Sequence, residues 1–285
     1  RAMDPKYHIE RNFLLDPLVL GDISLYQVGR MYCTEKTLVE KHVQCELFEL
    51  TIITGGKGIV RTNDVPAAVS QGDIYLSFPG DFHEIESDKE SPMKFDFISF
   101  NTTMEELHGK LKMIENDFIF PTCRVIQDNR ISVLCKNALA EVSNKEFLSE
   151  EMLRSTLFQI IVYLIRDFSA TKANVQPNTS DAELLCLKLM NYIDTHIYTL
   201  KNLEHLAEVF NYNYSYLSAL FNKITSRTLF EYYQNRRMEA ARLLIDEGVF
   251  SITQISEMLG YSSIYAFSRA FKLYYGHPPK TYSKK

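Results

Sequence analysis

The C-terminal third of the chain contains an internal repeat, and this repeat limits the folds open to it. Residues 203–223 and 252–272 superimpose with a one-residue offset. The paired positions carry apolar or small side chains: Leu203 and Ile252, Leu206 and Ile255, Ala207 and Ser256, Leu217 and Phe267, Phe221 and Phe271. Each copy has a short apolar-periodic segment, a turn and a second amphipathic segment, which is the plan of a helix-turn-helix unit. We expect two such units, at about 202–224 and 251–275.

Helical signals surround the repeat from residue 181 to the end of the chain. The apolar spacing predicts helices over 181–195, 202–210, 214–224, 228–246, 252–259 and 263–275. Asp181 is suited to cap the first helix, Ser251 and Gln254 have capping-box spacing, and Gly260 is suited to end its helix. The region 181–285 is therefore expected to be an all-α domain.

The N-terminal half shows a different period. Apolar runs of strand length, such as Leu47–Ile53, Ile74–Phe78 and Phe95–Phe100, alternate with turn signals rich in Gly, Asn and Asp. Many short strands at this spacing predict a sandwich or barrel. The run Gly55-Gly56-Lys57-Gly58 lies between strands with no helix after it, which favours a hairpin turn over a phosphate-binding loop.

Two amphipathic helices are expected to follow the barrel, at about 129–143 and 148–168, because apolar residues recur there at helical spacing. The polar segment 169–180, which contains a proline, is interpreted as a linker. Residues 1–5 resemble an expression scar, so the first domain is expected to span 6–168 and the second 181–285. The predicted fold class is an α+β multidomain protein, with a β-barrel and two helices followed by an all-α domain.

Charge is distributed unevenly between the two halves. The net charge is −5, but residues 1–181 hold 19 Lys and Arg against 27 Asp and Glu, whereas residues 182–285 hold 12 against 9. A phosphate-binding surface is therefore expected in the second half. The five cysteines are scattered without zinc-site spacing, and no apolar run is long enough to cross a bilayer. These features predict a cytoplasmic protein with reduced thiols and no membrane partner.

Two continuous motifs carry a resemblance to a known family. They are RRMEAARLLIDEG at Arg236–Gly248 and SITQISEMLGYSSIYAFSRAFKLYYGHPPKTY at Ser251–Tyr282. Together with the order of the helices, they make the C-terminal region similar to the AraC/XylS family of bacterial transcription regulators. The resemblance implies double-stranded promoter or operator DNA as the partner, with the second helix of each unit in the major groove. Ser226 stands where the family usually has Gly, and Ser256 where it usually has Ala.

The resemblance places base contacts on the second helix of each unit. In the first unit the groove-facing positions are Asn213, Ser215, Ser218 and Ala219. In the second unit they are Ser262, Ser263, Ile264, Tyr265 and Arg269. Short side chains read little sequence, so we expect the second unit to be the main reader, through Arg269 on a base edge and Ile264 on a thymine methyl. A phosphate contact or an intramolecular ion pair remains the alternative for Arg269.

Other basic residues are better suited to the DNA backbone. Contacts to DNA phosphates position the protein on the duplex but do not specify its sequence. They are expected at Lys223, Arg227, Lys272 and Lys280. Arg237 matches a recurrent arginine of the family, for which an ion-pair role and a DNA contact are both open.

His42 and Glu49 precede Gly55, and the stretch GDIYLSFPGDFHEI follows at Gly72–Ile85. With these residues, the N-terminal half resembles the arabinose-regulator branch, whose N-terminal part is a cupin-type barrel. Metal-binding cupins carry HxH in their first motif, but here it reads His42-Val43-Gln44, so the expected metal site is incomplete. The residues are instead interpreted as lining an effector pocket: His42, Gln44, Glu49 and His83 as polar groups, with Phe48, Tyr75 and Phe78 as apolar wall. No metal and no cofactor is expected, although a divalent ion or a plain hydrogen-bonded rim stays open for the polar set.

The combined pattern predicts a sequence-specific transcription regulator controlled by a small molecule in the barrel, a sugar or related metabolite. The helices within 129–168 are expected to form a homodimer seam, with packing on the barrel as the alternative. RNA polymerase stays open as a further partner. A regulator whose barrel serves only dimerisation is a second hypothesis. A metal-dependent cupin enzyme is a third, disfavoured because the HxH motif is incomplete and no nucleophile motif is present.

Overall fold

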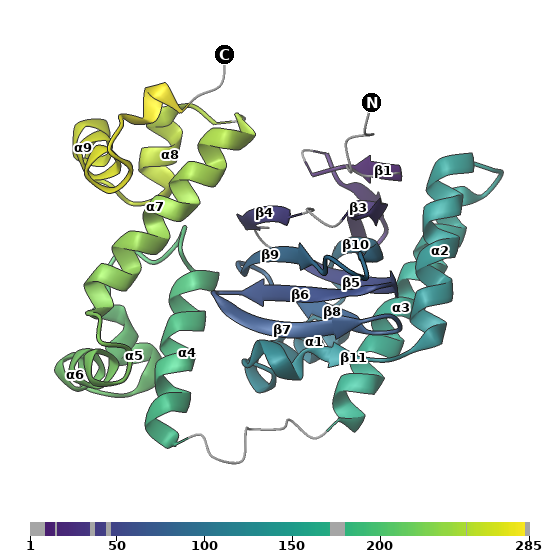
Figure 1. Ribbon diagram of the computed structural model, residues 1–285, viewed down its shortest axis with the longest axis horizontal. Helices are drawn as coiled ribbons and strands as arrows, with labels where there is room; N and C mark the ends of the chain where they lie inside the picture. The colour runs from purple at the N-terminus through teal and green to yellow at the C-terminus, as the bar shows by residue number, and fades with distance from the viewer. Residues whose placement is uncertain are drawn as a thin grey trace. The chain divides into compact units, whose positions relative to one another are not determined.

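Strands in the N-terminal half and helices in the C-terminal half fall into separate units, Arg1–Pro177 and Asn178–Lys285 (Figure 1). The computed structural model describes residues 9–14, 16–34, 38–43, 47–171, 180–248 and 250–282. Of the expected linker at 169–180, Ser169 and Ala170 belong to a helix, Ser180 caps the next helix, and residues 172–179 lie outside the described residues. Among the described helices, none is long and apolar enough to cross a membrane.

The N-terminal unit contains two antiparallel sheets, as the short apolar runs predicted. The larger sheet has the strand order β1-β3-β10-β5-β8-β11, with β2 paired to β3, and the smaller has the order β4-β9-β6-β7. The strands of the larger sheet are β1 Ile9–Asn12, β2 Leu18–Leu20, β3 Ile23–Tyr32, β5 Phe48–Gly55, β8 Ile74–Ser77, β10 Lys94–Thr102 and β11 Val125–Ile126. Those of the smaller sheet are β4 Leu38–Val43, β6 Lys57–Thr62, β7 Val65–Ser70 and β9 Phe82–Ser87.

The two faces of the larger sheet carry different cores. One face packs with residues of the smaller sheet, such as Val60, Val69 and Ile85, around Tyr75 and Phe95. The space between the two sheets, lined by this face, is called the interior below. The opposite face packs against three helices: α1 Glu105–Asp117, α2 Asn129–Asn144 and α3 Ser149–Ala170. Because strand side chains alternate between faces, β3, β5, β8 and β10 contribute to both cores.

The helices at the outer face are only partly those expected. The predicted ranges 129–143 and 148–168 agree with α2 and α3, but α1 was not predicted from the sequence. Buried residues such as Ile131 and Cys135 of α2, and Leu157 and Ile160 of α3, pack into the core against the sheet. Most of the apolar stripe on these helices is therefore absorbed within the unit.

The glycine run between β5 and β6 is a corner between the two sheets, not the predicted hairpin. The two strands belong to different sheets, and Gly56 alone separates them. Gly56 has φ +69°, and a Cβ there would lie 2.1 Å from the Pro92 carbonyl oxygen. A residue with a side chain cannot make this corner without displacing the backbone.

The C-terminal unit is all-α, as predicted. Its helices are α4 Asp181–Thr195, α5 His205–Phe210, α6 Tyr214–Thr225, α7 Leu229–Glu247, α8 Ile252–Met258, α9 Ile264–Tyr275 and the short 3-10 helix η2 Pro279–Thr281. The capping box of Ser251 and Gln254 is confirmed. Ser180, rather than Asp181, caps α4 and forms a capping box with Glu183.

The sequence repeat becomes a structural repeat of α5-turn-α6 and α8-turn-α9. The turn hydrogen bonds are equivalent, because Tyr212 N donates to Ala207 O at 3.1 Å and Tyr261 N donates to Ser256 O at 3.0 Å. Ser256 is buried, which fits a small residue where the two helices cross. Asn211 and Gly260 both take the left-handed conformation that ends the first helix of each unit.

Helix α7 connects the two repeats through a pair of adjacent buried arginines. The Nε atom of Arg236 lies 3.1 Å from Oδ1 of Asp194 in α4, the helix that precedes the first helix-turn-helix unit. Arg237 donates to the carbonyl oxygen of Leu259, at the end of α8, and its guanidinium lies 3.7 Å from the centre of the Tyr261 ring. Arg237 therefore has a structural role, as a cap on α8 within the second unit.

Replacing Arg237 with Ala should destabilise the C-terminal unit by about 2–4 kcal/mol, because it removes a buried charged hydrogen bond and a cation-π contact. Urea unfolding followed by circular dichroism measures the change. Arg242→Ala on the same helix is the matched control, since this side chain is exposed and makes only a 3.5 Å contact with Asp246 and a distant, 5.9 Å contact with the Tyr275 ring. Equal losses in both variants would contradict the role assigned to Arg237.

Ser226 and Gly276 end α6 and α9 at equivalent positions, with φ +57° and φ +79°. A left-handed serine costs about 1 kcal/mol relative to glycine, so Ser226→Gly should stabilise the unit by about that amount. The reciprocal variant Gly276→Ser should destabilise it similarly. Differential scanning calorimetry tests both, and a lower melting temperature for Ser226→Gly would show that the Ser226 side chain makes a compensating contact.

Candidate functional site

The second helix of each repeat presents its N-terminal end to solvent. Asn213 caps α6, and its side-chain oxygen accepts a hydrogen bond from Ser215 N at 2.8 Å. Ser263 caps α9 in the same way, accepting from Ala266 N at 3.1 Å. The cap holds the Asn213 oxygen at the helix end, and the amide NH2 group remains able to donate to a base edge.

Helix α9 carries the larger exposed side chains of the two. Tyr265 is 84% exposed, and Arg269 lies one turn further along the same exposed stripe. No ion pair of Arg269 occurs within the part of the chain that the structure describes. Ser262 and Ser263 are exposed, whereas Ile264 is half-buried. The guanidinium is therefore accessible to a base or to a phosphate.

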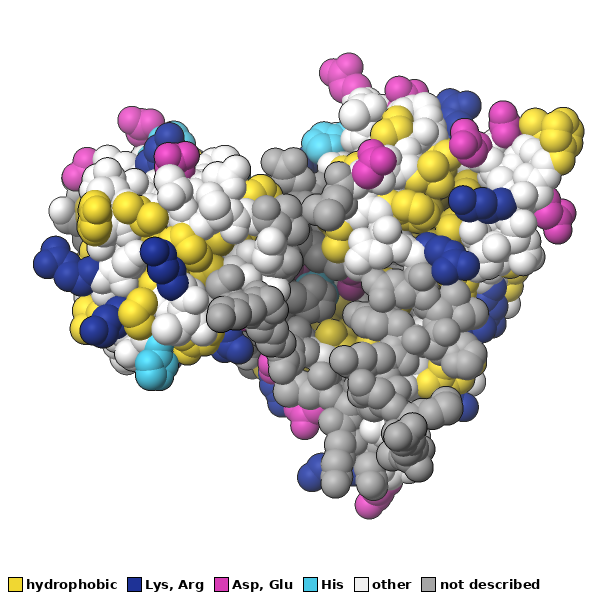
Figure 2. Space-filling model, turned by 90° about the horizontal axis from the view of Figure 1, so that it is seen from above, with side chains coloured by type: hydrophobic (Ala, Val, Ile, Leu, Met, Phe, Trp, Pro, Cys, Tyr) yellow, Lys and Arg dark blue, Asp and Glu magenta, His cyan; other side chains and the backbone are white. Residues whose placement is uncertain are grey.

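Helix α6 offers only short groups at the corresponding places. Ser215 and Ala219 are exposed and Ser218 is half-buried. The four phosphate candidates are all exposed: Lys223, Arg227, Lys272 and Lys280. On the face of the C-terminal unit seen in Figure 2, Lys and Arg side chains lie among hydrophobic ones. Two exposed apolar residues were missed from the sequence, Leu273 at 88% and Phe230 at 60% exposure.

A row of four polar side chains crosses the larger sheet and faces the interior of the N-terminal unit. Cross-strand register aligns Gln27 of β3 with Ser99 of β10, Ser99 with Glu49 of β5, and Glu49 with Ser77 of β8. All four are buried. We call this set the polar row. The feature of the sequence that could have revealed the polar row is a polar residue at an alternate position of an otherwise apolar strand.

Hydrogen bonds connect part of the polar row to the smaller sheet. The Ser99 hydroxyl donates to Glu49 Oε2 at 2.9 Å. Glu49 Oε1 lies 3.3 Å from Nε2 of His83, which comes from β9 of the smaller sheet. Glu49 and His83, predicted from the sequence as members of one pocket, are therefore brought together across the interior.

The next row of the sheet is mixed in polarity. Phe97, Thr51 and Tyr75 are aligned on β10, β5 and β8, and the Tyr75 hydroxyl shares a 2.7 Å hydrogen bond with Thr62. Burial raises the pKa of Tyr75 to about 12, so its hydroxyl stays protonated at neutral pH. Beyond this row, Met31, Ile53 and Phe95 are apolar, so the interior changes from polar to apolar along the strands.

Two predicted wall residues lie on the wrong face. Phe48 and Phe78 belong to the core beneath the helices, where Phe48 stacks on Phe100 and Phe78 lies under the Arg124 guanidinium. They alternate with Glu49 and Ser77, which face the interior. Gln44 lies outside the described residues, and for His42 only the backbone is described, paired with His83.

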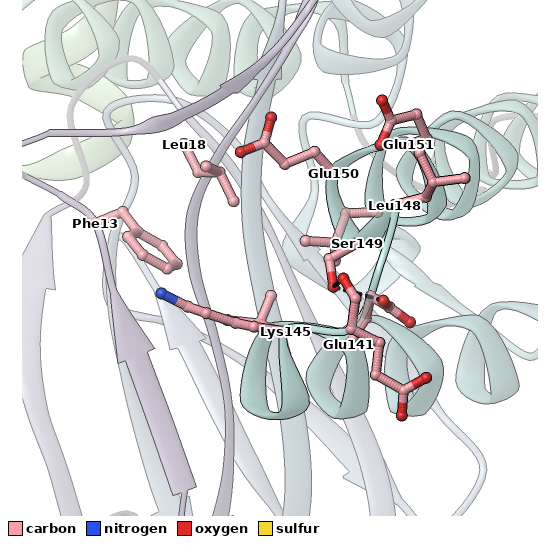
Figure 3. Close-up of a pocket in the computed structure, with 11 residues that line it drawn as sticks. Phe13, Leu18, Glu141, Lys145, Leu148, Ser149, Glu150 and Glu151 are labelled. Carbon is pink, nitrogen blue, oxygen red and sulfur yellow. Dashed lines mark hydrogen bonds between the residues drawn. The ribbon is translucent and has the colours of Figure 1, made fainter.

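Two surface pockets lie outside this interior. One, of about 380 Å³, is formed where Phe13 and Leu18 meet the α2–α3 connection, and four glutamates line it (Figure 3). The other, of about 320 Å³, lies along α3 beside Arg154 and Phe158. Of the predicted effector residues whose side chains are described, none lines either pocket. Among the described residues, no group of three or more His, Cys, Asp or Glu side chains is arranged to hold a metal ion.

Comparisons with known proteins match both units. A family model described as an AraC-like ligand binding domain matches residues 27–161, and one described as a helix-turn-helix domain matches residues 206–285. The Msm operon regulatory protein of Streptococcus mutans is 24% identical over 84% of this chain and 84% of its own length. The raffinose operon transcriptional regulatory protein of Pediococcus pentosaceus is 25% identical over 81% and 83%.

A shorter relative matches the C-terminal unit, and a solved structure aligns along most of the chain. Regulatory protein SoxS of Salmonella typhimurium is 33% identical over 33% of this chain and 88% of its own length. A structure of ToxT from Vibrio cholerae aligns over 92% of this chain and 98% of that chain, at 15% identity and a TM-score of 0.44.

The two family models agree with the structure, in which a unit of two β-sheets precedes a helical unit with two helix-turn-helix repeats. The relatives are regulators and not enzymes. The chain belongs to the AraC family of DNA-binding transcription regulators, with an AraC-like ligand-binding domain ahead of its helix-turn-helix domain.

Proposed function

We propose that this regulator binds specific DNA sequences chiefly through α9 and that a small molecule in the interior of the N-terminal unit controls it. Its functional domains are residues 6–168 and 181–285, and it acts in the cytoplasm. The observation that carries the proposal is the difference between the two exposed recognition helices. Helix α9 presents Tyr265 and Arg269, whereas α6 presents Ser215 and Ala219 at the equivalent positions.

The two helices have different tasks in this proposal. Arg269 can donate two hydrogen bonds to a guanine, and Tyr265 beside it offers an aromatic face and a hydroxyl. On α6, Ser215 and Ser218 reach only short distances, and the Asn213 oxygen is held by its cap. Lys223, Arg227, Lys272 and Lys280 supply the phosphate contacts that position the first unit and the second on the duplex.

Arg269→Ala should weaken binding to a selected operator by about 1–3 kcal/mol while leaving binding to random DNA nearly unchanged, because a base contact is lost. The operator is obtained by selection from a random duplex pool, and fluorescence anisotropy gives both affinities. Asn213→Ala is the matched control on α6 and should lose less. Equal losses on operator and random DNA would make Arg269 a phosphate contact.

A saccharide is the effector that the relatives favour. Two of them are regulatory proteins named for the raffinose and Msm operons. The interior has the polar and apolar rows that a sugar needs, since a sugar presents hydroxyls at its rim and C–H groups on its faces. A thermal-shift screen of the full chain against sugars tests the proposal, because a ligand that binds the native state raises the unfolding temperature.

Helix α3 is the proposed seam of a homodimer. Met152 and Phe158 on this helix are 55% and 41% exposed although their neighbours are packed on the sheet. These exposed apolar groups suit a symmetric contact with a second copy. In the alternative function, the N-terminal unit only dimerises and takes no ligand; binding of a sugar would exclude it.

The double variant Met152→Glu and Phe158→Glu should weaken dimerisation by at least roughly 100-fold, because two charges would be buried at the seam. Sedimentation velocity over a range of protein concentrations measures this. Met113→Glu on α1, where the side chain is equally exposed at 55%, is the control. A monomeric parent protein at micromolar concentration, or equal dissociation of the control, would contradict the seam.

A further inference from the structure

Two exposed tyrosines at the start of α6 are stacked on each other. The ring centres of Tyr212 and Tyr216 lie 5.4 Å apart with 22° between their planes, and the two residues are 48% and 49% exposed. Tyr212 lies in the turn before α6, and Tyr216 lies in the first turn of the helix. Stacking restrains both side chains before any ligand arrives, so less conformational entropy is lost on binding. We call these two residues the tyrosine pair.

The second helix-turn-helix unit uses the corresponding positions differently. Tyr261 makes the same backbone hydrogen bond in its turn as Tyr212, but its ring lies 3.7 Å from the Arg237 guanidinium. The Tyr261 hydroxyl donates a 3.0 Å hydrogen bond to a glutamine of α7, so this tyrosine is part of the fold. Ala266 takes the position of Tyr216. The first unit therefore exposes an aromatic surface where the second unit packs its tyrosine internally.

Helical geometry places Tyr216 at the edge of the groove-facing side of α6. At about 100° per residue, the positions of Ser218, Ser215 and Ala219 span about 100° of the helix surface. Tyr216 lies about 60° beyond Ala219 and within about 20° of Lys223, the phosphate candidate of this helix. The sugar-phosphate backbones form the two walls beside a helix in the major groove. Tyr216 and Lys223 therefore face the same backbone.

From this placement we infer that the tyrosine pair holds the first unit on one strand of the DNA backbone without reading the base sequence. The inference rests on the proposed function, in which α6 positions the protein more than it reads. The tyrosine hydroxyls donate to phosphate oxygens, and the ring faces pack on the deoxyribose beside them. The pair thus supplies affinity that the short side chains of Ser215, Ser218 and Ala219 do not provide.

An uncharged contact to the backbone differs from a lysine contact in its dependence on salt. A lysine that neutralises a phosphate releases counterions and therefore steepens the fall of log affinity with log salt concentration, whereas a tyrosine does not. Lys223→Ala should make this slope shallower by about one. Loss of the tyrosine pair should lower the affinity at every salt concentration and leave the slope unchanged.

Fluorescence anisotropy of the full chain with the selected operator and with random duplex DNA, at several salt concentrations, tests the inference. The double variant Tyr212→Ala and Tyr216→Ala should weaken binding to both duplexes equally, by roughly tenfold. Tyr216→Phe keeps the stacked ring and removes one hydroxyl, so it should weaken both by roughly threefold. Tyr274→Ala is the matched control and should bind like the parent. This tyrosine is 42% exposed, also contacts another tyrosine ring, and lies about 180° around α9 from Tyr265.

Three results would overturn the inference. A loss confined to the operator would make the tyrosine pair a base reader, unchanged affinity for both duplexes would remove it from the DNA contact, and a shallower salt slope would indicate a general electrostatic effect. Thermal unfolding without DNA checks that the double variant folds; if it does not, Tyr216→Phe decides by the same criteria. Failure of the proposed base contact is measured separately, as an unchanged operator preference in Arg269→Ala.

Discussion

The alternation of side chains along the larger sheet is the constraint from which the N-terminal unit follows. In β5, Phe48, Leu50 and Ile52 face the helices, while Glu49, Thr51 and Ile53 face the smaller sheet. Both faces are buried, so one strand supports a helix-covered core and a second core at once. The second face carries the polar row, because register brings Gln27, Ser99, Glu49 and Ser77 together there.

The C-terminal unit depends in turn on two consecutive residues of α7. Adjacent helical positions point about 100° apart, so Arg236 and Arg237 reach different partners. Arg236 joins Asp194 and Arg237 holds the end of α8, and through them one helix orients both repeats. These two arginines are buried within the fold, whereas Arg269 and the lysines near the ends of α6 and α9, which we propose as DNA contacts, are exposed. Burial thus separates the structural arginines of α7 from the arginine proposed to contact DNA.

Prediction from the sequence succeeded where a local pattern was sufficient. The helices of the repeat were found because their apolar periodicity and capping residues are local signals. Prediction failed where both faces of an element are buried. Phe48 and Phe78 were assigned to the pocket because residue type alone does not indicate which of the two cores an apolar side chain enters. Helix α1 was missed because it has few apolar residues to show a helical period. The corner at Gly56 was missed because the close approach of the Pro92 carbonyl, which requires glycine, arises only in the folded chain.

The sequence by itself determined the two helix-turn-helix units, the contrast between Arg269 and the short side chains of α6, and the pairing of Glu49 with His83 as candidates. Each of these depends on residue type and spacing, which are visible in one dimension. Only the tertiary structure decided which side of the sheet each strand residue occupies, that Arg237 is internal, and that Gln27, Ser77, Thr51 and Ser99 join Glu49. Cross-strand register and burial arise from contacts between residues far apart in the chain, and a single sequence does not record them.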